Sequence, residues 1–293
     1  MDWDLPQLRA LAAAVDHGSL DAAARALHLT PSAISQRLKA LEQQVGAVLL
    51  QRTRPVRPTE AGAAVLRLAR QIDTLTADTG HALAIDDGGE SWPRVRIAVN
   101  AGSLATWVMP ALAPLAATVL IELLREDQDR TADLLRDGTA MGAVTSQATP
   151  VQGCTVERLG SMRYHPLASR SYAEHWFPDG VTPAALARAP MVVFDDADAL
   201  QHDALRRRGV EGAPAFHVVP SSAQFADAVR LGFGWGMLPD LQVDADAEGL
   251  VRLDPTGAWL EDVPLYWQQW SLQTPSLQAV ADALRTAART QLT

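Results

Sequence analysis

Four polar side chains stand three or four residues apart between Thr30 and Val45, and their types suit contacts with DNA. They are Ser32, Ser35, Gln36 and Lys39. Hydroxyl and amide groups can hydrogen-bond base edges in the major groove, and cations bind phosphates. The spacing places all four on one face of a helix. We therefore predict a DNA-reading face with contacts from Thr30, Ser32, Ser35, Gln36, Arg37 and Lys39.

Two short helices joined by a tight turn would position this face. Ser19 is a good N-cap for the first helix, His28 and Leu29 make the turn, and Thr30 followed by Pro31 is a strong start signal for the second helix. The opposite side of the second helix is apolar, with Ile34, Leu38, Leu41 and Val45. On spacing alone, an ordinary helical hairpin with a solvated polar face is the alternative.

The segment after the hairpin favours the DNA-binding interpretation. Residues 48–62 read VLLQRTRPVRPTEAG, a short apolar strand followed by Arg52, Arg54 and Arg57 among prolines, which predicts a basic wing. The stretch from AAARALHLTPSAISQRLKAL through this wing resembles the N-terminal signature of LysR-type bacterial transcriptional regulators. The resemblance implies a recognition helix in the major groove of double-stranded DNA, a wing on the backbone, a dimer or tetramer, activator function and RNA polymerase as a further partner.

A long helix is expected after the wing, with Thr59 as its cap. Its apolar residues recur at alternating spacings of four and three, which is typical of a coiled-coil seam. We predict dimerisation through Val65, Leu68, Ile72 and Leu75. The alternative is a helix packed on the body of its own chain. The Gly- and acid-rich residues 86–93 would then form a hinge.

From Val95 onward, short strands alternate with helices, which predicts parallel strands whose carboxyl ends gather ligands. We expect an α/β chain with an all-α winged helix-turn-helix domain (1–58), a linker helix and hinge (59–92) and a two-lobed α/β effector domain (93–293). Lobe I would comprise about 93–163 and 267–293, and lobe II about 164–266. This arrangement resembles the LysR-type effector domain, itself similar to periplasmic solute-binding proteins, and implies a cleft between the lobes.

Three longer stretches narrow the resemblance. Residues 121–147, 217–241 and 262–270 are similar to the ArgP/LysG subgroup, whose members respond to basic amino acids and control their export. The resemblance implies L-lysine, L-arginine or L-histidine as the small-molecule effector and an amino-acid exporter gene as the target.

A cationic effector needs a carboxylate, because a desolvated cation must be paired. Asp127 is the first candidate and Asp195 the second; hydroxyls at strand ends would hold the effector's α-carboxylate, and Trp107 would cover its methylenes. The predicted effector residues are Ser103, Trp107, Asp127, Thr145, Ser146, Asp195 and Ser222. Asp127 as a solvated loop acid, Asp129 as a helix cap and Trp107 as a core residue are the plain alternatives.

Composition and missing motifs exclude other classes. The 293 residues include 48% hydrophobic ones but no run of about 20 apolar residues, so we expect a cytoplasmic protein without membrane contact. The single cysteine, Cys154, is expected to be a buried structural thiol. Metal-binding, phosphate-loop and nucleophile motifs are absent, so we expect no metal, cofactor or catalytic residue. The rival is a cytoplasmic amino-acid-binding protein or enzyme of two-lobed fold without specific DNA targets.

Overall fold

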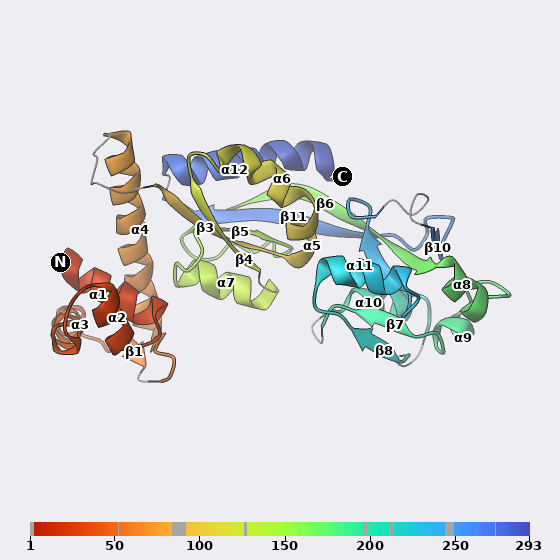
Figure 1. Ribbon diagram of the computed structural model, residues 1–293, viewed down its shortest axis with the longest axis horizontal. Helices are drawn as coiled ribbons and strands as arrows, with labels where there is room; N and C mark the ends of the chain where they lie inside the picture. The colour runs from red at the N-terminus through yellow and green to blue at the C-terminus, as the bar shows by residue number, and fades with distance from the viewer. Residues whose placement is uncertain are drawn as a thin grey trace. The chain divides into compact units, whose positions relative to one another are not determined.

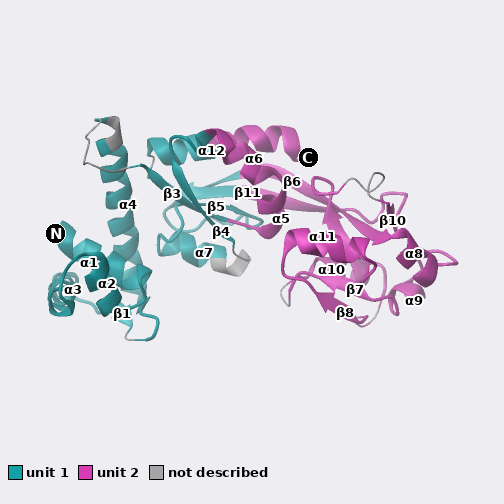
Figure 2. Ribbon diagram, viewed as in Figure 1, with its two compact units in different colours: residues 1–98, 115–157, 267–281 teal, residues 99–114, 158–266, 282–293 magenta. Residues whose placement is uncertain are grey.

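The computed structural model describes residues 3–51, 53–83, 92–125, 128–195, 198–210, 212, 214–243, 249–272 and 274–293, with the backbone alone at 81, 82 and 128–130. Arg52, Asp127 and most of the predicted hinge lie outside the described residues, as does the side chain of Asp129. The chain forms two compact units (Figure 2). Unit 1 comprises residues 1–98, 115–157 and 267–281, and unit 2 comprises 99–114, 158–266 and 282–293.

Unit 1 begins with three helices, α1 (Leu5–Asp16), α2 (Leu20–Ala26) and α3 (Pro31–Val45), drawn in red tones in Figure 1. Ser19 Oγ accepts the Ala22 N–H at 3.2 Å, and Thr30 Oγ1 accepts the Ala33 N–H at 3.2 Å, so both predicted N-caps are confirmed. His28 lies in the turn with a left-handed φ of 53°. Helix α2, the turn and α3 therefore form the predicted helix-turn-helix.

The wing follows as a short antiparallel hairpin. Strand β1 (Leu50–Gln51) pairs with β2 (Arg57–Pro58), with Leu50 opposite Pro58. Helix α4 (Glu60–Ala82) then begins, and the Gly62 N–H donates to Thr59 Oγ1 at 3.0 Å, which confirms the predicted cap. A Cβ on Gly62 would lie 1.9 Å from the Leu49 carbonyl oxygen. The wing and α4 thus approach each other more closely than a side chain at residue 62 allows.

Helix α4 packs partly on its own chain. Val65, Leu66 and Ala69 are 4%, 0% and 1% exposed and belong to one core with Leu8, Leu11 and Ile34. Ile72 packs against the same core, whereas Leu75 is 38% exposed. For Val65 the alternative of a helix packed on its own chain therefore holds, because its side chain is buried in a core that includes residues of α1 and α3.

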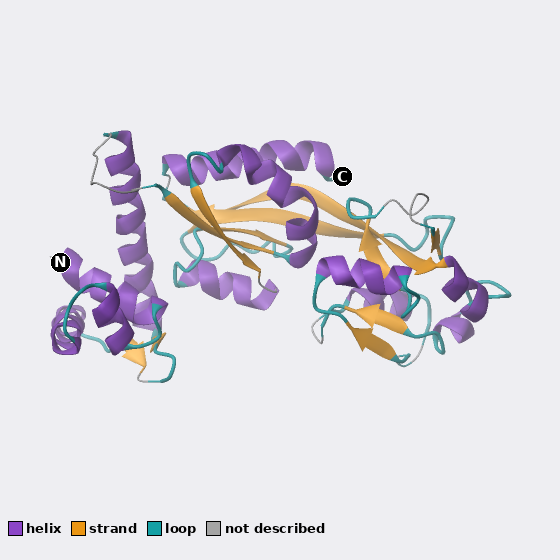
Figure 3. Cartoon of the chain, viewed as in Figure 1, coloured by secondary structure: helices purple, strands orange, loops and turns teal. Residues whose placement is uncertain are grey.

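The rest of unit 1 is α/β. It contains β3 (Arg94–Val99), β4 (Leu120–Arg125), α7 (Gln128–Arg136), β5 (Gly142–Thr145), the end of β11 (Glu261–Trp270) and the start of α12 (Pro275–Gln291). Helix α7 and the first turns of α12 lie on opposite sides of these strands (Figure 3). Trp267 packs against the backbone of Gly142, where a Cβ would lie 2.3 Å from the indole ring. This packing fixes the end of β11 beside β5.

Unit 2 is built around a long strand. Strand β6 (Cys154–Ser169) pairs antiparallel with β9 (Gly236–Pro239) and β10 (Leu250–Arg252), whereas β7 (Met191–Val193) and β8 (Phe216–Val218) are parallel. Its helical segments are α5 (Ala101–Ser103), η1 (Leu104–Val108), α6 (Met109–Leu112), α8 (Arg170–Trp176), α9 (Pro183–Leu186), α10 (Leu200–Arg207) and α11 (Ser222–Arg230), and η2 (Ala113–Leu115) lies at the unit boundary.

The strand order corrects the expectation of purely parallel strands. The seven-stranded sheet runs β10-β6-β11-β5-β3-β4, with β9 also paired to β6. Strands β6 and β11 are long enough to pass from one unit into the other, and the β6 pairings with β9 and β10 are antiparallel. Of the helices described, none combines the length and apolar character needed to cross a membrane.

Candidate DNA-binding and effector sites

Helix α3 separates a buried face from an exposed polar face. Ile34, Leu38 and Leu41 are 0%, 6% and 0% exposed and fix the helix in the core. The predicted DNA-reading residues on the other side are all exposed except half-buried Arg37: Thr30, Ser32, Ser35, Gln36 and Lys39. The hydroxyl of Thr30 caps the helix, which leaves the other polar groups on this face to meet a ligand.

The wing presents two of its three arginines in the described residues. Arg54 and Arg57 are exposed near the hairpin tip and at β2. Thr59 Oγ1 donates to the Val48 carbonyl at 2.7 Å, so the base of the wing is tied to the start of α4. An exposed cation pair on an anchored hairpin suits phosphate contacts beside a groove-bound helix.

A buried polar group lies where β3 leads into α5 in unit 2. Asn100 Oδ1 accepts the Ser103 N–H at 2.8 Å and caps the segment. Ser103 is 0% exposed, and its Oγ has no hydrogen-bond partner among the described residues. A buried hydroxyl of this kind costs free energy unless it finds a partner, so a bound polar molecule would stabilise it.

Tyr164 of β6 closes over the same segment. A Cβ on Gly102 would lie 2.7 Å from the Tyr164 hydroxyl oxygen, so only glycine allows this approach. Burial, with a smaller contribution from the charge of Asp198, raises the pKa of Tyr164 to about 12. The phenol therefore remains a neutral hydrogen-bonding group at physiological pH.

Two acids follow β7 in unit 2. Burial raises the pKa of Asp198, and the charge of Asp195 raises it further, against hydrogen bonds from the Phe194 and Leu200 N–H groups at 2.8 and 3.1 Å. The groups that act on Asp198 in the described part of the chain include no cationic side chain. A cation bound beside Asp198 would favour the ionised form of this carboxylate.

The remaining predicted effector residues are divided between the units. Thr145 and Ser146 lie in unit 1 at the end of β5, where Thr145 Oγ1 accepts the Gln147 N–H at 3.2 Å and the buried Ser146 Oγ has no partner among the described residues. Trp107 (3% exposed), Asp195 and Ser222 lie in unit 2, with Ser222 in the first turn of α11. The structure does not describe Asp127.

Three of the polar residues just described in unit 2 were not among the predicted effector residues. They are Asn100, Tyr164 and Asp198. Asp198 had a sequence signal, since FDDAD follows the buried strand MVV and places several acids at a strand end. Tyr164 had none, because it lies within β6, where the residues before PLAS show no clear strand pattern in the sequence.

The described residues contain no group of three or more His, Cys, Asp and Glu side chains placed to hold a metal ion. Cys154 is half-buried, and burial raises the pKa of its thiol against a smaller opposing effect of Arg67. The thiol therefore stays protonated and unreactive at neutral pH.

Comparison with known proteins identifies the family. Residues 5–63 match the bacterial regulatory helix-turn-helix protein model of the lysR family, and residues 88–289 match the LysR substrate binding domain. The regulator LysG of Mycobacterium tuberculosis is 48% identical over 291 residues, covering 97% of this chain and 93% of that protein. The lysine export transcriptional regulatory protein LysG of Corynebacterium efficiens is 42% identical over 285 residues, 95% of each chain.

Solved structures agree with these matches. The crystal structure of ArgP from M. tuberculosis superposes with a TM-score of 0.86 at 44% identity, covering 98% of both chains. Full-length LysG from Corynebacterium glutamicum with bound effector Arg superposes with a TM-score of 0.80 at 38% identity, covering 99% of both chains. The chain belongs to the LysR family of bacterial transcriptional regulators.

Proposed function

We propose that this regulator senses a basic amino acid and controls transcription of an amino-acid exporter gene. L-Arginine and L-lysine are the first candidates, with L-histidine the third. The observation that carries the proposal is the acidic pair Asp195 and Asp198, where burial and the charge of Asp195 raise the pKa of Asp198, so that a bound cation would favour its ionised form. The relatives support it, since one is a lysine export regulator and one was solved with arginine bound.

In this proposal the two ends of the amino acid meet different groups. The side-chain cation pairs with the carboxylates of Asp195 and Asp198, whereas the α-carboxylate accepts hydrogen bonds from the Ser103 hydroxyl and from amides at the start of a helical segment. Tyr164, neutral at physiological pH, is a further donor. Ser222, Thr145, Ser146, Trp107 and Asp127 remain predicted contacts.

Regulation then requires DNA, a second copy of the chain and the transcription machinery. The polar face of α3 reads bases in the major groove, and Arg54 and Arg57 hold the backbone. Two copies would occupy two half-sites, and contact with RNA polymerase in the cytoplasm would follow. Because the family consists of regulators, catalysis is not needed to explain the effector domain.

Calorimetry with four amino acids tests the effector. We expect L-arginine and L-lysine to bind more tightly than L-histidine, and uncharged L-norleucine to bind weakest. Asp195→Asn and Asp198→Asn should each weaken the cationic ligands by about 2–5 kcal/mol, because a desolvated cation loses its partner. Asp203→Asn is the matched control, since Asp203 pairs with Arg206 on exposed α10. Equal affinity for norleucine, or no loss in either Asn variant, would remove the proposed cation site.

Anisotropy titration tests the DNA half separately. The full chain should bind the DNA upstream of its own gene in a salt-sensitive and sequence-specific way, and L-arginine should change that affinity. If the chain binds this DNA no more strongly than a scrambled duplex, specific regulation at this site is contradicted. The calorimetric measurement of effector binding would not be affected.

A further inference from the structure

Helix α4 uses a second face, distinct from its core face, to contact the effector part of unit 1. Four of its residues, spaced three or four apart, make these contacts: Arg67, Arg70, Thr74 and Asp78. Arg67 Nη1 donates to the Gln152 carbonyl at 2.7 Å, and Asp78 Oδ2 accepts from the Ser276 N–H and Oγ at 3.2 and 2.8 Å. One side of α4 is therefore built to hold the effector domain.

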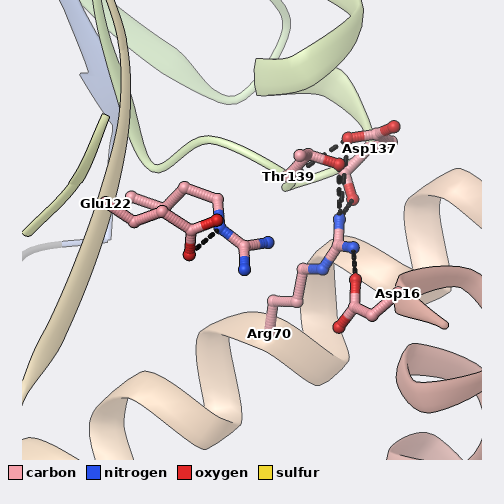
Figure 4. Close-up of polar contacts among 6 residues, drawn as sticks. Asp16, Arg70, Glu122, Asp137 and Thr139 are labelled. Carbon is pink, nitrogen blue, oxygen red and sulfur yellow. Dashed lines mark hydrogen bonds and ion pairs between the residues drawn. The ribbon is translucent and has the colours of Figure 1, made fainter. Parts of the chain in front are cut away.

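Arg70 differs from the other three because it also reaches the first domain. Its Nη2 donates to Asp16 Oδ1 at the end of α1, while its Nη1 donates to the Asp137 carbonyl at 3.1 Å and to Thr139 Oγ1 at 2.8 Å. Figure 4 shows the guanidinium lying between Asp16 and the turn that carries Asp137 and Thr139. One side chain on the linker helix thus joins the DNA-binding domain to the effector domain.

The contact is shielded and closely fitted. The Arg70 side chain is only 11% exposed, and those of Asp16 and Asp137 are 37% and 25% exposed. Gly138, between the two turn partners, has φ +77°, and a Cβ there would lie 2.9 Å from the Arg67 Cα. A planar fork with partners on both sides gives more specificity than an exposed ion pair, which is screened by solvent.

The cavity and the charged residues around Arg70 show why its contacts matter for joining α1 to the Asp137–Thr139 turn. Next to it lies a cavity of about 590 Å³, lined by Ala12 and Asp16 of α1, by α4 and by β3 and β4. The neighbouring charges pair with each other, Arg96 with Glu122 at 2.8 Å and Arg9 with Asp73 at 3.4 Å. Open space beside the fork means that the turn can shift relative to α1 with little loss of packing at this point.

We propose that Arg70 is an interdomain clip: it fastens α1 of the DNA-binding domain to the Asp137–Thr139 turn of the effector domain, and its release is a step in the change between regulatory states. Fastening follows from the contacts alone, whereas the link to effector response rests on the proposed function. Because the fork has partners on both domains, losing either set removes this direct tie between α1 and the turn, while the α1–α4 core and the other contacts of α4 remain.

A distance measurement in the full chain tests the fastening without any ligand. In a Cys154→Ser background, spin labels at exposed Gln44 of α3 and exposed Thr118 before β4 report the first domain against the effector part of unit 1. Mixing with excess unlabelled chain restricts the signal to one protomer. We expect a single narrow distance, which Arg70→Met should broaden or shift. Asp16→Asn, which removes the charge of one partner, and Thr139→Val, which removes the hydroxyl of another, should do so to a smaller degree.

Arg9→Met is the matched control. Arg9 also joins α1 to α4, through Asp73, but both side chains are about half exposed and this pair lies within the first domain and the linker helix. Its loss should leave the distance unchanged. An unchanged distribution in Arg70→Met, or an equal change in Arg9→Met, would overturn the clip.

The regulatory half is measured as the ratio of DNA dissociation constants with and without L-arginine. Arg70→Met and Asp16→Asn should bring this ratio at least threefold closer to one, with calorimetric binding of L-arginine retained. A ratio like that of wild type in both variants would overturn the regulatory role. If wild type itself gives a ratio of one, the proposed effector response fails, and the spin-label distance alone decides whether the clip exists.

Discussion

Single residues on α3 have one of two roles. Ile34, Leu38 and Leu41 are buried and hold the helix, while Ser35, Gln36 and Lys39 project from it without a structural task that the core requires. Substitution on the exposed face should therefore change DNA binding with little effect on the free energy of unfolding, because surface changes of this kind usually stay within about 0.5 kcal/mol.

The division between base reading and backbone contact gives the first prediction. Gln36→Ala should weaken binding to the cognate duplex by about 1–3 kcal/mol and reduce discrimination against altered duplexes. Arg54→Ala should weaken binding to all duplexes alike, because a phosphate carries no sequence information. Competition titrations with cognate and altered duplexes measure both effects. The same pattern in the two variants would show that the assigned roles are wrong.

The pH dependence of effector affinity gives the second prediction. The pKa of Asp198 is raised by burial and then by Asp195, so this carboxylate takes up a proton at a higher pH than an ordinary aspartate. Affinity for L-arginine should be full above that raised pKa and fall as the pH is lowered through it. Calorimetry over a pH series measures the loss, and Asp198→Asn should flatten the profile while Asp203→Asn keeps it.

The raised pKa of Asp198 has the opposite effect on the stability of the folded state. Since the folded chain binds the Asp198 proton more tightly than the unfolded chain does, lowering the pH between the two pKa values favours the folded state at this residue. Stability and effector affinity would therefore respond to mild acid with opposite signs. A parallel loss of both would indicate that other groups dominate the acid response.

The sequence pattern was sufficient to predict the role of a residue only where a single helix or strand determines its exposure. The caps Ser19, Thr30 and Thr59 depend on local backbone and could be predicted. Tyr164 approaches Gly102, and Asp198 acts on Tyr164, through tertiary packing that no spacing along the chain encodes. That is why the caps and the exposed face of α3 could be predicted from the sequence, whereas the groups around Ser103 could not.

At the scale of elements, α4 illustrates how a heptad-like pattern can serve several partners. Its residues divide into a core face with Val65 and Leu66, a face toward the effector part of unit 1 with Arg70 and Asp78, and a third face with Leu68 and Leu75. The apolar pattern predicted the helix and its cap but could not separate burial in the chain's own core from an interface between copies.

The third face carries the third prediction. Leu68→Glu or Leu75→Glu should shift the assembly toward monomer in sedimentation velocity, because a charge in an apolar seam between copies is desolvated. Thr76→Glu is the control, as Thr76 is exposed and lies about 80° around the helix from Leu68. If both Leu variants keep the wild-type assembly, the main interface between copies does not use α4.

Strand β6 shows a different limit of sequence patterns. It runs without a break from Cys154 to Ser169, although only its last part, PLAS, has an apolar strand pattern in the sequence. Charged residues such as Glu157 and Arg163 interrupt the apolar alternation, and Arg163 is paired outside the core with Asp262 at 2.8 Å. Pairing with β9 and β10 supplies the stabilisation that the strand's own sequence does not signal.

At the scale of the whole molecule, charge is strongly segregated along the chain. Residues 1–70 contain nine Lys and Arg and six Asp and Glu, an excess of +3, so with a net charge of −9 the remaining residues carry −12. The acidic remainder opposes nonspecific attraction to DNA at low salt. Affinity must then come from a few cations placed correctly by α3 and the wing.

The salt dependence of DNA binding is the fourth prediction, because it measures how many cations contact phosphates. Lys39, Arg54 and Arg57 are the exposed cations of the described DNA-binding surface, so a dimer would neutralise about six phosphates and give a log–log slope of about −5. Raising salt fourfold should then weaken binding about a thousandfold. Arg57→Ala, present in both copies, should reduce the slope by about two, whereas Arg136→Ala on exposed α7 should leave it unchanged. A slope near zero would mean that this surface does not meet phosphates. If Arg57→Ala has the same slope as wild type, Arg57 of the wing does not contact phosphates, and the proposed position of α3 in the groove is unaffected.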